Sequence, residues 1–144
     1  EAKKVLARAD ILIVNREEAE KLLNTGFNKE SGRGLLNRLL KLGTKEAVVT
    51  NGADGAWAGN DSEAWEIPSF PVAVVSKTGA GDAFSAGYLA ARFYNHDLTT
   101  ALKWGIASSC AVISSSGPKK NLPNIGEIKK IIARFSSIEP KPAN

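Results

Sequence analysis

The chain has 144 residues, of which 43% are hydrophobic and 24% are charged, so it can bury one core and its composition excludes a disordered chain. Its formal charge of +4 comes from lysines and arginines scattered along the sequence, which does not indicate a nucleic-acid-binding face. No apolar run reaches the ~18 residues that a membrane-spanning helix needs, and the first residues do not resemble a signal peptide. We therefore expect one cytoplasmic domain with neither a nucleic-acid nor a membrane partner, and homo-oligomerisation stays open.

The first 52 residues alternate helical and strand-like patterns. Residues 11–15, ILIVN, are an uninterrupted apolar run of strand length, which is typical of a strand buried on both faces in a parallel sheet. Residues 45–52 contain a second run of this kind. Helical periodicity is found in residues 1–10, 16–24 and 33–43.

The second half continues the alternation. Two short strands in residues 55–60 and 63–69 are predicted to form a hairpin through Asn60 and Asp61, and residues 72–76, VAVVS, predict a further strand. Residues 138–144 resemble a frayed tail. The remaining helices are expected at residues 81–94, 98–116 and 123–137. This order predicts an α/β fold with a mostly parallel sheet.

The single cysteine and the single histidine limit the chemistry. Cys110 lies in the small apolar stretch IASSCAV, which indicates buried packing, and one cysteine excludes an internal disulfide. His96 lies between Asn95 and Asp97 in a predicted turn, so a metal site or a Ser-His-Asp triad would have to be built on that one residue. Neither arrangement is favoured by the sequence.

The turn KTGAG, residues 77–81, joins the predicted strand at 72–76 to a helix. Ligands of open α/β sheets bind at this end of a strand. Gly79 and Gly81 allow an anion to approach peptide N–H groups, and the helix N-terminus adds further donors. Asp82 could then accept a proton from a hydroxyl that attacks phosphorus. The alternative is that Asp82 only caps the helix, and the turn lacks the Gly-Lys-Ser/Thr of a P-loop.

Four segments carry a resemblance to a known family. TGAGDAFSAG resembles the second signature of the ribokinase-like (PfkB) carbohydrate and nucleoside kinases, which usually reads Asp-Thr-x-Gly-Ala-Gly-Asp. NREEAEKL resembles the family's Asn-x-x-Glu motif, and VVTNGADGA resembles its Val-Thr-x-Gly-x-x-Gly segment. ALKWGIASSCAVISSSG resembles the small-residue helix beside the adenine, which Gly117 closes. Together they cover residues 10 to about 125 in the family's order.

The resemblance implies a ribokinase-like three-layer α/β/α fold, of which residues 1–144 are the carboxy-terminal, nucleotide-binding half. It also implies transfer of the γ-phosphate of ATP, with Mg²⁺, to a hydroxymethyl group of a sugar or nucleoside. The alternative is a non-catalytic nucleotide-binding or scaffold module derived from a kinase. The amino-terminal half, which supplies the sugar-binding acid and a β lid in the family, is expected to be absent, so this chain alone is expected to be inactive.

The resemblance also assigns roles to residues. Asp82 is implied as the general base, with Gly79, Ala80 and Gly81 as the anion hole. Glu18 is implied to help hold Mg²⁺ through water, together with Asn15, although a strand-end cap followed by an acidic helix turn explains the same pair. The implied nucleotide-binding residues are Asn15, Thr50, Gly52, Gly55, Thr78, Ala107 and Ala111.

Three positions depart from the family pattern. Ser76 replaces the first Asp of the signature, which in many members helps to hold a monovalent cation, and Lys77 follows it. One hypothesis is that the Lys77 ammonium replaces that ion, and the alternative is a solvated turn lysine. Ile106 stands where the family often has a polar residue, so contacts with the adenine are expected to differ.

Overall fold

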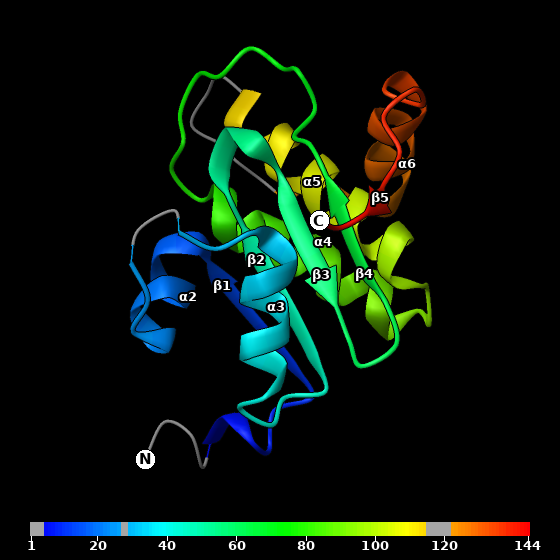
Figure 1. Ribbon diagram of the computed structural model, residues 1–144. Helices are drawn as coiled ribbons and strands as arrows, with labels where there is room; N and C mark the ends of the chain where they lie inside the picture. The colour runs from blue at the N-terminus through cyan, green and yellow to red at the C-terminus, as the bar shows by residue number, and fades with distance from the viewer. Residues whose placement is uncertain (1–4, 27–28, 115–121) are drawn as a thin grey trace. The chain divides into compact units, whose positions relative to one another are not determined.

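The computed structural model describes residues 5–26, 29–114 and 122–144, which divide into two compact units (Figure 1). The sheet unit comprises residues 1–66 and 141–144, and the helical unit comprises residues 67–140. Within the described ranges, no helix combines the length and the apolar character needed to cross a lipid bilayer.

The sheet unit is built on five strands in the order β1-β2-β3-β4-β5. Strands β1 and β2 are parallel, whereas β2 and β3, and also β4 and β5, are antiparallel. The α/β class is therefore as predicted, and the sheet in this part of the chain is mixed. The strands span Ile11–Asn15 (β1), Glu46–Thr50 (β2), Ala56–Gly59 (β3), Ala64–Ile67 (β4) and Lys141–Pro142 (β5).

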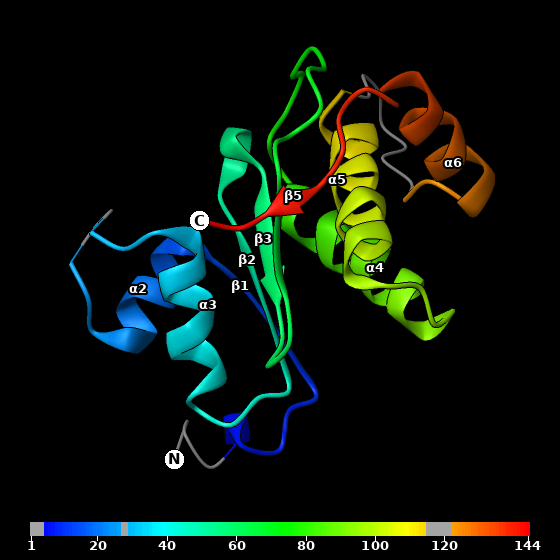
Figure 2. The ribbon, with the colours of Figure 1, turned by 45° about the vertical axis from the view of Figure 1, so that its right-hand side comes forward.

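Helices α2 (Arg16–Leu23) and α3 (Gly32–Leu40) lie on the same side of β1, β2 and β3 (Figure 2). Leucines three and four positions apart form the apolar face of α3, as the helical period requires. They pack with α2 and β2 into the core of the unit. Its fully buried members are Ala19, Leu35, Leu36, Leu39, Ala47 and Val49.

The two predicted apolar strands differ in burial. Four of the five residues of β2 are fully buried, as predicted for a strand covered on both faces. In β1 the four apolar residues are only half-buried and Asn15 is exposed, so the prediction of full burial was wrong for this strand. The reason is its position, because β2 is its only neighbour among the described strands.

The predicted hairpin is confirmed. Strands β3 and β4 are neighbours in the sheet, and the N–H of Asn60 donates to the carbonyl oxygen of Glu63 at 2.9 Å. The Asn60 side-chain oxygen also accepts from the N–H groups of Ser62 and Glu63 at 2.9 and 3.0 Å. This side chain closes the turn in the way expected of asparagine.

The predicted frayed tail is instead part of the sheet. The N–H of Ala143 donates to the carbonyl oxygen of Ala64 at 3.0 Å, and the N–H of Arg33 donates to the carbonyl oxygen of Asn144 at 3.1 Å. Ala143 is only 1% exposed. The expectation was wrong because it rested on local composition, whereas β4 and α3 supply long-range partners for this backbone.

The helical unit contains α4 (Ala80–Phe93), α5 (Leu98–Ser114) and α6 (Ile125–Arg134). Helices α4 and α5 run side by side (Figure 2), and small residues allow the close contact. A Cβ atom added to Gly87 would lie 2.2 Å from Ser108 Oγ, and one added to Gly105 would lie 2.7 Å from the Phe84 ring. Cys110 is buried in this unit, as predicted.

The strand predicted at residues 72–76 is absent, because this described segment has no strand partner. The N–H groups of Val75 and Ser76 donate instead to the carbonyl oxygen of Ile113 at 2.8 and 3.2 Å. Val74 and Val75 are more than half exposed. Their β-branched side chains suit a strand, but a strand also needs a paired neighbour.

Part of the sequence-based prediction lies outside the described residues. Residues 1–4 of the expected first helix belong to this part, and so does Gly117. After residue 4, the N–H groups of Arg8 and Ala9 donate to the carbonyl oxygens of Val5 and Leu6, which forms a single turn.

Candidate active site

The predicted site residues fall in both units, and each group is described within its own unit. The sheet unit holds Asn15, Glu18, Thr50, Gly52 and Gly55. The helical unit holds Thr78, Gly79, Ala80, Gly81, Asp82, Ala107 and Ala111.

In the sheet unit, the strand register brings two predicted residues together. Parallel pairing of β1 with β2 sets Asn15 directly opposite Thr50. Both residues end their strands, so they share the carboxyl edge at which open α/β sheets bind ligands. Asn15 is exposed and Thr50 is half-buried, so this edge can be reached from solvent.

Asn15 and Glu18 form a reciprocal capping box at the start of α2. The Glu18 N–H donates to Asn15 Oδ1 at 2.8 Å, and the Asn15 N–H donates to Glu18 Oε2 at 2.9 Å. The capping role that the sequence left open is therefore present. It orients both side chains, and both residues are exposed.

Among the described residues there is no group of three or more His, Cys, Asp or Glu that could hold a metal ion directly. One carboxylate and one amide oxygen at a sheet edge do not form such a group, but they can contact the waters bound to Mg²⁺. This ion prefers oxygen ligands and keeps several of its waters. The donors of the sheet unit thus fit contact with Mg²⁺ through water.

The loop after β2 contains two glycines with left-handed backbone angles. Gly52 has φ +56° and opens the short helix η1 (Gly52–Asp54), and Gly55 has φ +102°. Gly55 is buried and accepts a hydrogen bond from the Asn51 N–H at 2.8 Å, so it shapes the turn. Gly52 is exposed and a Cβ atom there would have no neighbour within 4 Å, which leaves room for a ligand.

In the helical unit, Gly79 is the N-cap of α4 and has φ +82°, a conformation that favours glycine. The Ala80 N–H donates to the carbonyl oxygen of Lys77 at 3.3 Å, and the Ala83 N–H donates to that of Gly79 at 3.0 Å. The N–H groups of Gly79 and Gly81 have no acceptor among the described residues. Gly81 is exposed, and a Cβ atom there would meet nothing within 4 Å, so this residue can be approached from solvent.

Asp82 is the third residue of α4 and is exposed. The N-cap is Gly79, and no side chain caps this helix. The alternative that Asp82 serves as the N-cap is therefore wrong. Its carboxylate remains available beside the unused N–H groups of the glycine turn.

The other predicted residues of the helical unit differ in accessibility. Thr78 is exposed, and its N–H donates to Ser76 Oγ at 3.3 Å. Ala107 and Ile106 are buried in α5, whereas Ala111 is half-buried. Of the two predicted neighbours of the adenine, Ala111 therefore offers the more accessible surface.

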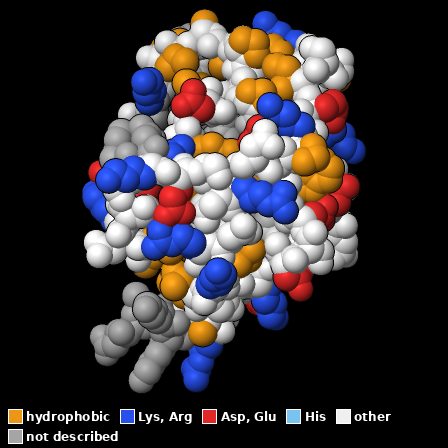
Figure 3. Space-filling model, in the orientation of Figure 1, with side chains coloured by type: hydrophobic (Ala, Val, Ile, Leu, Met, Phe, Trp, Pro, Cys, Tyr) orange, Lys and Arg blue, Asp and Glu red, His pale blue; other side chains and the backbone are white. Residues whose placement is uncertain are grey.

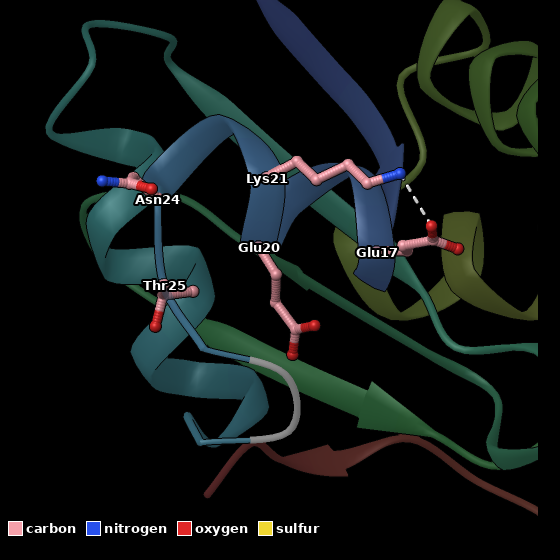
Figure 4. A pocket seen from close by; sticks show the side chains of 5 residues that line it. All are labelled: Glu17, Glu20, Lys21, Asn24 and Thr25. Carbon is pink, nitrogen blue, oxygen red and sulfur yellow. Dashed lines mark hydrogen bonds and ion pairs between the residues drawn. The ribbon is translucent and has the colours of Figure 1, made fainter.

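A cavity of about 450 Å³ in the sheet unit contains no predicted site residue. Figure 4 shows the Glu17–Lys21 pair at one end of the cavity and Asn24 and Thr25 at the other, with Glu20 between them. The Lys21 ammonium lies 2.7 Å from Glu17 and lowers the pKa of that carboxyl group. Motif analysis did not select these residues, because polar and charged side chains in and just after an amphipathic helix have no distinguishing sequence signal.

Positive and negative side chains are interspersed on the face shown in Figure 3. Several lysines are paired with acids, including Lys45 with Asp10 at 2.6 Å and Lys103 with Glu139 at 2.9 Å. Hydrogen bonding to Lys45 lowers the pKa of Asp10. The basic balance of the sequence is thus not gathered into a single region on this face.

Comparisons with known proteins agree with these motifs. The model of the pfkB family carbohydrate kinases matches residues 1–125. The chain is 32% identical over 129 residues to an ATP-dependent 6-phosphofructokinase of Thermoanaerobacterium thermosaccharolyticum, covering 90% of this chain and 39% of that protein. It is 28% identical over 127 residues to a 5-dehydro-2-deoxygluconokinase of Clostridium perfringens, covering 88% of this chain and 38% of that protein.

The fold is also similar to that of an E. coli protein assigned as ribokinase II and crystallised with ATP and Mg²⁺. The TM-score is 0.79 at 28% identity, and the match covers 92% of this chain and 42% of that one. The chain thus spans about two fifths of the length of these relatives. Since the family model matches residues 1–125 of 144, the chain belongs to the pfkB family of carbohydrate kinases and has a ribokinase-like α/β fold.

Proposed function

We propose that the chain is the carboxy-terminal, nucleotide-binding part of an ATP-dependent kinase that phosphorylates a hydroxymethyl group of a sugar or nucleoside. Family membership supports a kinase. The names of the two relatives, a phosphofructokinase and a deoxygluconokinase, favour a carbohydrate acceptor over a nucleoside.

The state of Asp82 is the observation that carries this proposal. Its carboxylate is exposed at the first turn of α4 and is not used to cap the helix. In the proposed reaction it accepts the proton of the acceptor hydroxyl as the hydroxyl oxygen attacks the γ-phosphorus. General-base catalysis of this kind contributes about 10²–10⁴-fold to a rate.

The glycine turn is proposed as the anion hole. The N–H groups of Gly79 and Gly81 have no acceptor among the described residues, and a Cβ atom on exposed Gly81 would meet nothing within 4 Å. They can donate to the oxygens of the transferring phosphoryl group without first breaking a bond within the protein. Donors that are already oriented stabilise developing charge without reorganisation. Ala80 is the weaker donor of the three, because its N–H already turns back to Lys77.

The sheet unit is proposed to contribute to nucleotide binding. Asn15, Glu18 and Thr50 lie at the carboxyl edge of β1 and β2, and Gly52 leaves space beside them. Mg²⁺, when bound, neutralises charge on the nucleotide phosphates. The capping box would hold the Glu18 carboxylate in one orientation for water-bridged contact with the ion.

A coupled assay of ADP release by the complete gene product tests the proposal, with a panel of sugars, sugar phosphates and nucleosides as acceptors. We expect turnover with a carbohydrate and none by residues 1–144 alone, since the match covers only 39% and 38% of the two relatives. ATP binding without turnover on any acceptor would instead support the non-catalytic module, which the replacement of the family's Asp by Ser76 favours. Failure to bind ATP would refute both.

A further inference from the structure

We propose that Lys77 binds the terminal phosphates of the nucleotide and supplies the fixed cation that the glycine turn otherwise lacks. The inference rests on the proposed function and adds a residue to its phosphate-binding site. No lysine of a Gly-Lys-Ser/Thr P-loop is present in the sequence, so a lysine that contacts the terminal phosphates would have to come from another position.

The backbone around Lys77 is held at both ends. On one side, the N–H groups of Val75 and Ser76 donate to the carbonyl oxygen of Ile113 at 2.8 and 3.2 Å, which ties the segment to α5. On the other side, the Lys77 carbonyl oxygen accepts from the Ala80 N–H at 3.3 Å. The Lys77 side chain therefore starts from a fixed point two residues before Gly79, the N-cap of α4.

Hydrogen bonds within the turn keep Lys77 close to the unused donors. The Thr78 N–H donates to Ser76 Oγ at 3.3 Å, which folds the chain on itself at this lysine. The next available donors are the N–H groups of Gly79 and Gly81. A phosphate that accepts from these groups would lie within the region that the flexible lysine stem can sample.

The Lys77 ammonium also lacks an acidic partner among the described residues, and its side chain is exposed. Other lysines behave differently: Lys21, Lys45, Lys103 and Lys141 each form an ion pair at 2.6–3.1 Å. No bond within the described chain would have to break for Lys77 to contact an anion.

The negative charge of Asp82 is a further reason for a cation at this turn. A nucleotide phosphate that enters the glycine turn approaches the exposed Asp82 carboxylate, which repels it. The dipole of α4 offsets this repulsion only in part, because a helix N-terminus is equivalent to about half of one elementary charge. An ammonium on the same turn lowers the electrostatic cost of placing the γ-phosphate beside the base.

The test measures ATP and AMP affinities by titration calorimetry. It compares four forms of the complete protein: wild type, Lys77→Ala, Lys77→Arg and Lys129→Ala. Lys129 is an exposed lysine of α6 with no acidic partner among the described residues, so Lys129→Ala is the matched control. We expect Lys77→Ala to weaken ATP binding about tenfold, the loss of one contact to a charged group. We expect AMP binding to stay unchanged, since AMP lacks the terminal phosphates.

Lys77→Arg should retain ATP affinity within about threefold, because it keeps the charge. ATP affinity should also fall less steeply with salt in Lys77→Ala than in wild type. Far-UV circular dichroism checks that the variants fold, and Lys77→Gln repeats the test with a longer neutral side chain.

Unchanged ATP affinity in Lys77→Ala would overturn the inference, and so would an equal loss of ATP and AMP affinity. If wild type phosphorylates a sugar and the Lys77 variants bind ATP normally, only this inference fails. If wild type binds no ATP, the proposed function fails as well.

Discussion

The contact between α4 and α5 predicts that Gly87→Ala destabilises the protein. An added Cβ atom would lie 2.2 Å from Ser108 Oγ and 2.6 Å from the carbonyl oxygen of Trp104. The hydroxyl can rotate, but the carbonyl belongs to the backbone of α5, so the two helices have to separate. The fold of the helical unit depends on this close approach.

The size of the effect follows from two opposing terms. Overpacking of this kind costs about 1–3 kcal/mol, and a clash with backbone places Gly87 at the upper end of that range. Replacing glycine by alanine in the interior of a helix gains about 1 kcal/mol. We therefore expect Gly87→Ala to lower the free energy of unfolding by about 2 kcal/mol.

Urea denaturation followed by far-UV circular dichroism measures this change. Gly81→Ala is the matched control, because it lies in the same helix and its Cβ atom would meet nothing within 4 Å. It should leave stability unchanged or raise it slightly. Ser108→Ala should restore only part of the loss in the double variant, because the Trp104 carbonyl remains. A Gly87→Ala protein as stable as wild type would show that the predicted steric conflict does not exist.

Three further predictions concern the ends and the interior of the chain. Asp97→Ala should cost about 1 kcal/mol at pH 7, because Asp97 Oδ1 accepts from the Thr100 N–H at 2.8 Å at the start of α5. That backbone hydrogen bond lowers the pKa of Asp97. The stabilisation by the Asp97 carboxylate is therefore present above the unfolded pKa of about 3.9 and is lost as pH falls through the folded pKa. Urea titrations at pH 7 and pH 3 should show a smaller difference in the free energy of unfolding between wild type and variant at the lower pH. Burial raises the pKa of the Cys110 thiol, so Ellman's reagent should react at pH 8 only after denaturant is added, and prompt reaction in the native state would contradict the burial. Deletion of residues 141–144 should lower the free energy of unfolding by about 2 kcal/mol, since it removes β5, buried Ala143 and two backbone hydrogen bonds, and an unchanged urea midpoint would refute this.

Local signals predicted much of the fold. The apolar segments predicted at residues 11–15 and 45–52 contain β1 and β2, as their strand length and their place between helical segments indicated. The polar residues at their ends, Asn15 and Thr50, are adjacent because parallel register is set by the strands themselves. The two strands were predicted individually, and their direct pairing is a finding of the structure.

Features that depend on distant partners could not be predicted in this way. Residues 141–144 look like a tail because their partner β4 lies about 75 residues earlier in the chain. Conversely, VAVVS has the composition of a strand but bonds to Ile113 of α5. Neither outcome is determined by local propensity, because strand formation requires a neighbour.

In the candidate site, too, one feature could be predicted from local sequence and another could not. The need for glycine at residue 79 could be predicted, because a turn into a helix often requires a left-handed angle there, and φ is +82°. Whether Asp82 caps α4 or stays free could not, since aspartate is common in both roles. The structure decides this point by placing Gly79 at the N-cap.

The most direct test of the proposed mechanism is Asp82→Asn in the complete gene product, assayed for turnover and for ATP affinity. Asparagine keeps the size of the side chain but cannot accept the hydroxyl proton at neutral pH. We expect kcat to fall by about 10²–10⁴-fold, with the dissociation constant for ATP unchanged or lowered, because a repulsive charge beside the phosphate is lost. An Asp82→Asn protein with near-normal kcat would contradict the assignment of Asp82 as the general base.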